Sequence, residues 1–212
     1  VSNKASNLIT YAFEPIHEIY NVLKENLQNI NGNIKTYNIG LGKEKSRIEF
    51  YYYPKVSADS TAIPFDMNRK VDLYVENYKD TIYKGFPITR IVPKFLRKFV
   101  VRKGLEKFYQ GKKVICNLLI LSDVNKQNNL DVINLLKVDA ENYESQVLAG
   151  INDNDWEKIQ QIVIEVHEHI EGGKNLTKKI STLFKNKGFK VNLGEETRES
   201  ILDVYMIYAI RN

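Results

Sequence analysis

Short apolar runs alternate along this chain with segments in which apolar residues recur at helical spacing. Residues 8–13 (LITYAF) form an apolar and aromatic run that stops at Pro15, which predicts a buried strand. Between residues 16 and 27 the apolar positions follow a helical period. A second strand is predicted at residues 34–39. Strand, helix and strand with short connections are typical of a parallel sheet in an α/β protein.

The rest of the chain continues this alternation. Further strands are predicted at residues 47–53, 113–121, 132–139, 159–167, 189–193 and 204–210. Helices are predicted at residues 94–109, 144–150 and 175–187, and Ser122 and Asp123 are expected to cap another short helix. A polar loop joins the last two strands, so we expect them to pair antiparallel.

Composition points to one globular domain over residues 1–212. Apolar residues make up 43% and charged residues 27% of the chain, and no run of 18 apolar residues occurs. The first residues carry no basic region followed by an apolar stretch, so no secretory signal is predicted. Cys116 is the single cysteine and lies in an apolar run, which predicts a buried, inert thiol in a cytoplasmic protein.

Positive charge is concentrated in one segment. Residues 67–113 hold 13 Lys or Arg against four acids, a net charge of +9, so the remainder of the chain carries −4. We interpret this segment as a basic helical insertion whose helix at residues 94–109 places Phe95, Phe99, Leu105 and Phe108 on one face. The first expectation is a lid over a substrate crevice, and the second is a surface that docks an acidic carrier domain. Membrane contact ranks below these, and a nucleic-acid partner is not expected.

Acidic residues follow or close several of the predicted strands. Glu14 ends the first strand, Asp139 ends the strand before residues 140–144, and Glu165 and His167 close the strand at residues 159–167. Ligands of open parallel sheets bind at the carboxyl ends of strands. A carboxylate there accepts two hydrogen bonds from a ribose diol, so a nucleotide-like cofactor is predicted.

Four sequence blocks in this order resemble the FkbM-type S-adenosylmethionine-dependent methyltransferases: YAFEP, YNIGLG, LLKVDAENYESQVLAG and IVIEVHE. The segment VLAGINDNDWEKIQQIVIEVHE is similar to methyltransferase domains of polyketide and nonribosomal peptide assembly lines. The resemblance implies a class I methyltransferase (Rossmann-like) fold, a mostly parallel seven-stranded sheet with one antiparallel strand. It also implies methyl transfer to an oxygen of a small molecule or carrier-bound intermediate in secondary metabolite biosynthesis.

The resemblance assigns roles to individual residues. Glu14 is expected to bind the ribose of S-adenosylmethionine, and Asp139 to lie near its methionine end and the acceptor, with Lys137 and Glu141 close by. Three consecutive residues are expected to flank the adenine: Ile39, Gly40 and Leu41. From the residues themselves, His167 is a candidate general base, because an unperturbed imidazole titrates near pH ~6.5 and this one ends a strand at the crevice. Asp139 is the other candidate base, and Lys137 is a third expected catalytic residue.

One part of the family pattern does not occur in the sequence. The family has a strand and a loop of the form D-x-G-A-N-x-G before the block that ends in AFEP, and this chain begins after that point. We expect an N-terminally truncated domain in which the strands ending at Glu14 and Asp139 each lack one hydrogen-bonded neighbour. Cofactor binding by these residues alone is then expected to be weak.

Several of these candidate site residues also have a purely structural interpretation. Glu14 could close a strand in solvent, Asp139 could cap a helix, and Glu144 is expected to be only a first-turn acid. Glu165 is expected to point away from its apolar neighbours and to pair with Lys137. His17 and His169 are expected on the surface. Cysteine and histidine show no zinc-type spacing, so no metal is predicted.

Two other functions remain open from the sequence. The chain could be a noncatalytic docking module that lacks the glycine loop and holds a partner through its basic insertion. A dinucleotide-dependent oxidoreductase also places an acid after the second strand of a nucleotide-binding half, although the block LLKVDAENYE speaks against it.

Overall fold

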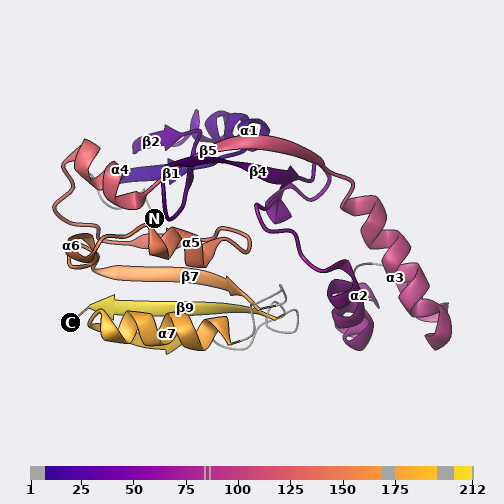
Figure 1. The fold of residues 1–212 in the computed structure, drawn as a ribbon. Coiled ribbons are helices and arrows are strands. Elements are labelled where there is room, and N and C mark those ends of the chain that lie inside the picture. Colours follow the sequence, from indigo (N-terminus) through magenta and orange to yellow (C-terminus); the bar gives the residue numbers. More distant parts are fainter. Residues whose placement is uncertain (1–7, 84, 86, 169–174, 195–202, 212) are drawn as a thin grey trace.

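The structure is a computed structural model that describes residues 8–83, 85, 87–168, 175–194 and 203–211. Its strands form three sheets (Figure 1). The first is the parallel pair β1 (Ile9–Phe13) and β2 (Asn33–Tyr37). In the second, β5 (Lys112–Leu119) lies between β3 (Gly40–Leu41) and β4 (Ser46–Tyr52). The third has the order β6 (Leu136–Val138), β7 (Gln161–His167), β9 (Val204–Arg211) and β8 (Phe189–Leu193).

Helices connect and cover these strands. The α-helices are α1 (His17–Leu27), α2 (Met67–Glu76), α3 (Lys94–Phe108), α4 (Leu121–Asn128), α5 (Glu144–Ala149), α6 (Asp153–Trp156) and α7 (Leu176–Asn186). Shorter turns are η2 (Ser57–Asp59), η3 (Lys79–Tyr83) and η4 (Pro87–Ile91). Figure 1 shows α2 and α3 side by side at one end of the molecule, away from α7.

The α/β prediction is confirmed, but the described strands do not form one sheet with a single antiparallel strand. The pairs β1–β2, β3–β5 and β6–β7 are parallel, whereas β4–β5, β7–β9 and β8–β9 are antiparallel. The expected antiparallel pairing of the last two strands is therefore confirmed. Within the described residues β1 pairs only with β2 and β6 only with β7, as expected for strands that each lack one neighbour.

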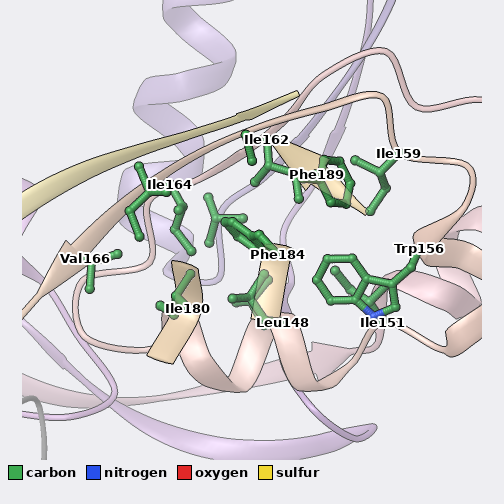
Figure 2. Packing of buried hydrophobic residues seen from close by; sticks show 14 of the residues in the cluster. Leu148, Ile151, Trp156, Ile159, Ile162, Ile164, Val166, Ile180, Phe184 and Phe189 are labelled. Carbon is green, nitrogen blue, oxygen red and sulfur yellow. The ribbon is translucent and has the colours of Figure 1, made fainter. Parts of the chain in front are cut away.

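Strand β7 has two different faces, and this difference positions the functional side chains. Ile162, Ile164 and Val166 are almost completely buried and point to one side of the sheet. There they pack with α7 and α5, and Figure 2 shows Phe184 of α7 in the centre of this core. Because side chains alternate along a strand, Glu165 and His167 share the opposite face. The predicted orientation of Glu165 is confirmed.

Two local predictions about helices were wrong. Ser122 does not cap α4, because that helix already begins at Leu121; its hydroxyl instead accepts a hydrogen bond from the backbone N–H of Asn152 at 2.9 Å. The sequence interpretation also missed α2, which Asp66 caps by accepting a hydrogen bond from Asn68 N at 2.7 Å.

The predicted apolar face of α3 is confirmed at Leu105 and wrong at its three phenylalanines. Val101 and Leu105 are the buried residues of this helix, and they pack against α2. Phe95 and Phe99 are instead 82% and 62% exposed. Packing against α2 determines which face of α3 is buried. The sequence of α3 alone does not contain this information. In the described part of the chain, no helix is both long and apolar enough to cross a membrane.

Candidate functional site

The predicted acids and histidine meet where the parallel strands β6 and β7 end. Lys137 of β6 lies opposite Val163 of β7, so both strands run toward the same edge of the sheet. After β6 the chain passes through Asp139 and Glu141 into α5. At the same edge β7 presents Glu165 and then His167.

The turn between β6 and α5 has an unusual backbone conformation. Glu141 and Asn142 have φ values of 45° and 76°, in the left-handed region, which costs a residue with a side chain about 1–2 kcal/mol. Two residues that follow β4 hold this turn in place. The hydroxyl of Thr61 donates a hydrogen bond to the carbonyl of Glu141, and the Asn142 amide donates to the carbonyl of Ile63 at 3.0 Å. The surrounding contacts therefore stabilise a conformation that the chain alone disfavours.

Glu144 and His167 form a buried pair behind this turn. The carboxylate of Glu144 is completely buried, and its Oε1 lies 2.8 Å from Nδ1 of His167. The same oxygen accepts a hydrogen bond from Asn142 N at 3.0 Å. The prediction that Glu144 is only a first-turn acid was wrong, because α5 places it under the end of β7. Its contact fixes the orientation of the ring and directs Nε2 away from α5.

Two further carboxylates lie beside the other ring nitrogen. Oε2 of Glu141 and Oε1 of Glu165 are each 3.5 Å from Nε2 of His167. Burial lowers the pKa of His167, but hydrogen bonds to Glu144 and Glu165 and the charges of Glu144 and Glu141 outweigh it and raise the pKa to about 10. Burial raises the pKa of Glu141 to about 7, although the charge of His167 opposes this shift.

A cavity of about 200 Å³ opens above these groups. Glu141, Asn142, Glu165 and His167 line one side, and the opposite wall comes from η2 and α2, including Asp59, Lys70, Leu73 and Tyr74. Among the described residues, the helix of the basic insertion that lines the cavity is α2, and α3 packs against α2. The lid role of this insertion stays a prediction.

Lys70 brings a buried positive charge to the cavity wall. Its Nζ lies 3.1 Å from Asp59 and sits over the rings of Phe65 and Tyr109, 4.2 Å and 4.3 Å from their centroids. Burial lowers the pKa of Lys70, and the carboxylate of Asp59 opposes that shift. The cavity can therefore contact both anionic and cationic groups of a ligand.

Lys137 and Asp139 lie on the exposed side of the site. The Lys137 ammonium is 2.6 Å from the Asp139 carboxylate, and their side chains are 59% and 35% exposed. The predicted pairing of Lys137 with Glu165 was wrong, because the residue two positions along its own chain is nearer to it. Asp139 remains electrostatically close to Glu141 and contributes to the raised pKa of that carboxyl.

Glu14 forms a second group at the end of β1. Its Oε1 accepts a hydrogen bond from Ile16 N at 2.7 Å, and Asn38 donates to its backbone carbonyl at 3.0 Å. Burial raises the pKa of Glu14, although the Ile16 N–H opposes the shift. Within the described part of the chain, no donor reaches Oε2. The carboxylate is thus held at the strand end with one oxygen available to a ligand.

The segment predicted to flank adenine lies next to Glu14. Gly40 and Leu41 form β3, and Asn38, one residue before Ile39, also donates to the carbonyl of Pro15 at 3.1 Å. A Cβ on Gly40 would lie 2.6 Å from Leu118 of β5. The glycine therefore has a packing role in addition to any role in ligand binding. Its adenine-binding role stays a prediction.

His17 and Cys116 do not line this cavity. His17 is exposed and lies 3.0 Å from the side chain of Asn38, whereas His169 lies outside the described residues. Cys116 is buried as predicted, and burial raises the pKa of its thiol to about 11. Such a thiol is a poor nucleophile.

Sequence analysis missed Asp59 and Lys70 as site residues. Asp59 precedes α2 and Lys70 lies within it, and α2 was not predicted. A usable signal existed, since Asp66 is a good N-cap and Met67 and Val71 begin a helical apolar repeat.

Comparison with known proteins identifies a family for the chain. The family model described as the methyltransferase FkbM domain matches residues 2–191. AmbE of Pseudomonas aeruginosa, an antimetabolite synthetase, is 26% identical over the whole chain, which spans 10% of that protein. Methyltransferase 1 of Beauveria bassiana is 28% identical over 95% of the chain and 71% of its own length.

Further matches are more limited. The 31-O-demethyl-FK506 methyltransferase FkbM of Streptomyces tacrolimicus is 32% identical over 48% of this chain and 37% of its own length. The crystal structure of methyltransferase FkbM from Methylobacillus flagellatus aligns over 94% of this chain and 36% of its own, with a TM-score of 0.46 and 15% identity. Since the family model matches most of the sequence, the chain belongs to the FkbM methyltransferase domain family.

Proposed function

We propose that the protein transfers a methyl group from S-adenosylmethionine to an oxygen of a small-molecule or carrier-bound acceptor. Family membership supports methyl transfer, and relatives named as methyltransferases match most of the chain. The observation that carries the proposal is the convergence of Glu141, Glu165 and His167 at the ends of two parallel strands. We also propose the class I arrangement, in which the parallel pairs β1–β2 and β6–β7 belong to one cofactor-binding sheet.

Glu14 is the residue best suited to hold the cofactor ribose. Its carboxylate is half-buried, fixed by Ile16 N and left with one oxygen that no described donor reaches. Such an oxygen can accept a hydrogen bond from a hydroxyl group. The bound cofactor would supply a methyl group on a sulfonium, and the position of Gly40 and Leu41 near Glu14 supports binding of its adenine there.

The acceptor is proposed to bind in the cavity under α2. Nε2 of His167 and the carboxylate of Glu141 lie at its wall. Because the raised pKa of about 10 keeps His167 protonated at neutral pH, Glu141, with a pKa of about 7, is the group that can take a proton from an acceptor hydroxyl. Asp139 and Lys137 lie at the exposed rim and can contact the cofactor or a longer acceptor. Positioning the two reactants in line supplies most of the rate enhancement.

Calorimetry with S-adenosylhomocysteine tests this proposal. Glu14→Ala is expected to weaken binding by about 1–3 kcal/mol, the worth of a hydrogen-bonded charged group. Glu25→Ala removes an exposed carboxylate from the following helix and is expected to leave binding unchanged. Equal affinity of the two variants, or no binding by the parent protein, would contradict the proposed cofactor site.

A further inference from the structure

Three side chains at the cavity wall have the geometry of metal ligands. One ligand atom from each of Glu141, Glu165 and His167 lies within 4.8 Å of the others. Nε2 of the histidine is 3.5 Å from each carboxylate oxygen. Atoms that bind one ion at about 2.1 Å are about 3–4 Å apart, so small side-chain rotations bring all three to a common ion.

Glu144 prepares His167 for this role. Its fully buried carboxylate lies 2.8 Å from Nδ1 and keeps a proton on that nitrogen. Nε2 lies between Glu141 and Glu165, where a bound cation would take the place of its proton. Protein metal sites commonly hold a ligand histidine through such a carboxylate on the second ring nitrogen.

An independent observation comes from Asn142. This residue lines the same cavity and is only 6% exposed, yet no described donor reaches its Oδ1. Its Nδ2 donates to the carbonyl of Ile63, which fixes the orientation of the amide. A buried oxygen without a partner is costly, and a cation in the cavity provides one.

The balance of side chains also favours a cation. Four carboxyl groups and two basic side chains lie at or beside the cavity. The acids are Asp59, Glu141, Glu144 and Glu165, and the basic residues are Lys70 and His167. Lys70 lies 3.1 Å from Asp59 on the opposite wall. Excess negative charge therefore remains beside His167, where the three ligand atoms converge.

We propose that Glu141, Glu165 and His167 bind a divalent cation, with the amide oxygen of Asn142 as a fourth ligand. Two carboxylates, one imidazole and no thiolate suit a Mn²⁺-type ion. The use of this ion rests on the proposed function: it binds the acceptor hydroxyl and lowers its pKa. The O–H bond then breaks with release of the proton to water, and an O–CH₃ bond forms as the sulfonium C–S bond breaks.

Titration of the chelator-treated protein with Mn²⁺ tests the site, with the electron paramagnetic resonance signal of free Mn²⁺ as the readout. We expect one Mn²⁺ per chain. Glu165→Gln removes one ligand and is expected to weaken binding at least tenfold, since even loss of an outer contact to a ligand costs about 10–100-fold. Glu157→Gln makes the same change at an exposed position and is expected to bind like the parent.

Thermal unfolding shows whether the variants fold, and Glu141→Gln replaces Glu165→Gln if the latter does not. Absence of a stoichiometric Mn²⁺ site, or equal affinity of the ligand variant and Glu157→Gln, would overturn the proposal. Calorimetry with S-adenosylhomocysteine is a separate readout. If the protein binds Mn²⁺ but not S-adenosylhomocysteine, the metal site stands and the proposed function fails. If it binds S-adenosylhomocysteine but not Mn²⁺, only the metal site is overturned.

Discussion

The sheet β6–β7–β9–β8 and the helical pair α2–α3 differ sharply in how they are packed. Among the described residues, the main core around the sheet contains 15 buried residues from strands and helices, whereas the core of the helical pair has four, Val71, Tyr78, Val101 and Leu105. The outer face of α3 leaves Phe95 and Phe99 exposed. The functional groups on β7 therefore belong to the well-packed part, and the opposite cavity wall belongs to the weakly packed part.

Polar and aromatic contacts join the helical pair to neighbouring segments. Lys70 of α2 pairs with Asp59, Arg69 of the same helix pairs with Asp203 at 2.7 Å, and Tyr109 stacks edge-on with Phe65. Regions with few buried apolar contacts open at lower free energy than a central sheet. We therefore expect the helical pair to open more readily than the sheet.

The largest expected effect is on the free energy of unfolding and compares the main core with the helical pair. Phe184→Ala leaves a cavity at the centre of the main core (Figure 2), and we expect it to lower the free energy of unfolding by about 3–5 kcal/mol. Phe95→Ala makes the same change on the exposed face of α3 and is expected to alter stability by less than about 0.5 kcal/mol. Urea denaturation measures both. Similar losses for the two variants would show that α3 is packed as tightly as α7.

The second prediction concerns the buried pair beneath the site. Glu144→Ala removes the acceptor of the His167 ring N–H and of Asn142 N, and we expect it to cost about 1.5–3 kcal/mol of stability. Glu157→Ala removes an exposed acid and serves as the control. Thermal and urea unfolding provide the measurement, and a loss no greater than that of the control would argue against the buried hydrogen bonds.

The smallest expected effect is at the contact between α2 and the sheet. Arg69→Ala breaks an ion pair whose side chains are 45% and 26% exposed, so the global loss of stability is expected to be below about 1 kcal/mol. Hydrogen exchange of the α2 amides is nevertheless expected to accelerate while exchange in β7 stays unchanged. Arg47→Ala, at an exposed site on β4, is the control. Uniform acceleration in α2 and β7 would indicate one cooperative unit instead of two.

Strands were predictable where burial alone determines them. Apolar runs located β5 and β7 because a buried strand needs little information beyond its own sequence. The run at β1 also located a strand, but the prediction that this strand is buried was wrong, since none of its residues is buried and Ile9 is 44% exposed. Contacts set by other elements were not predictable in this way. Glu144 was assigned to the helix surface because its burial depends on His167, 23 residues later, and the exposed face of α3 depends on α2.

The candidate site was predicted only in part, because contacts between distant elements bring some of its residues together. Strand ends located Glu141 and His167 in one region, because parallel strands end at one edge. Lys70 and Asp59 join them only through α2 and the loop before it, which the sequence analysis did not identify. Docking of an acidic carrier domain on the basic segment, and the single-domain boundary with its basic insertion, stay predictions.

The central claim is that Glu14 and the Glu141–His167 group bind the two reactants of one methyl transfer. A crystal structure of the protein with bound S-adenosylhomocysteine tests it most directly. The account predicts the ribose hydroxyls within hydrogen-bond distance of the Glu14 carboxylate and the sulfur directed toward the cavity lined by Glu141 and His167. A nucleoside bound away from Glu14, or a sulfur directed away from this cavity, would contradict it.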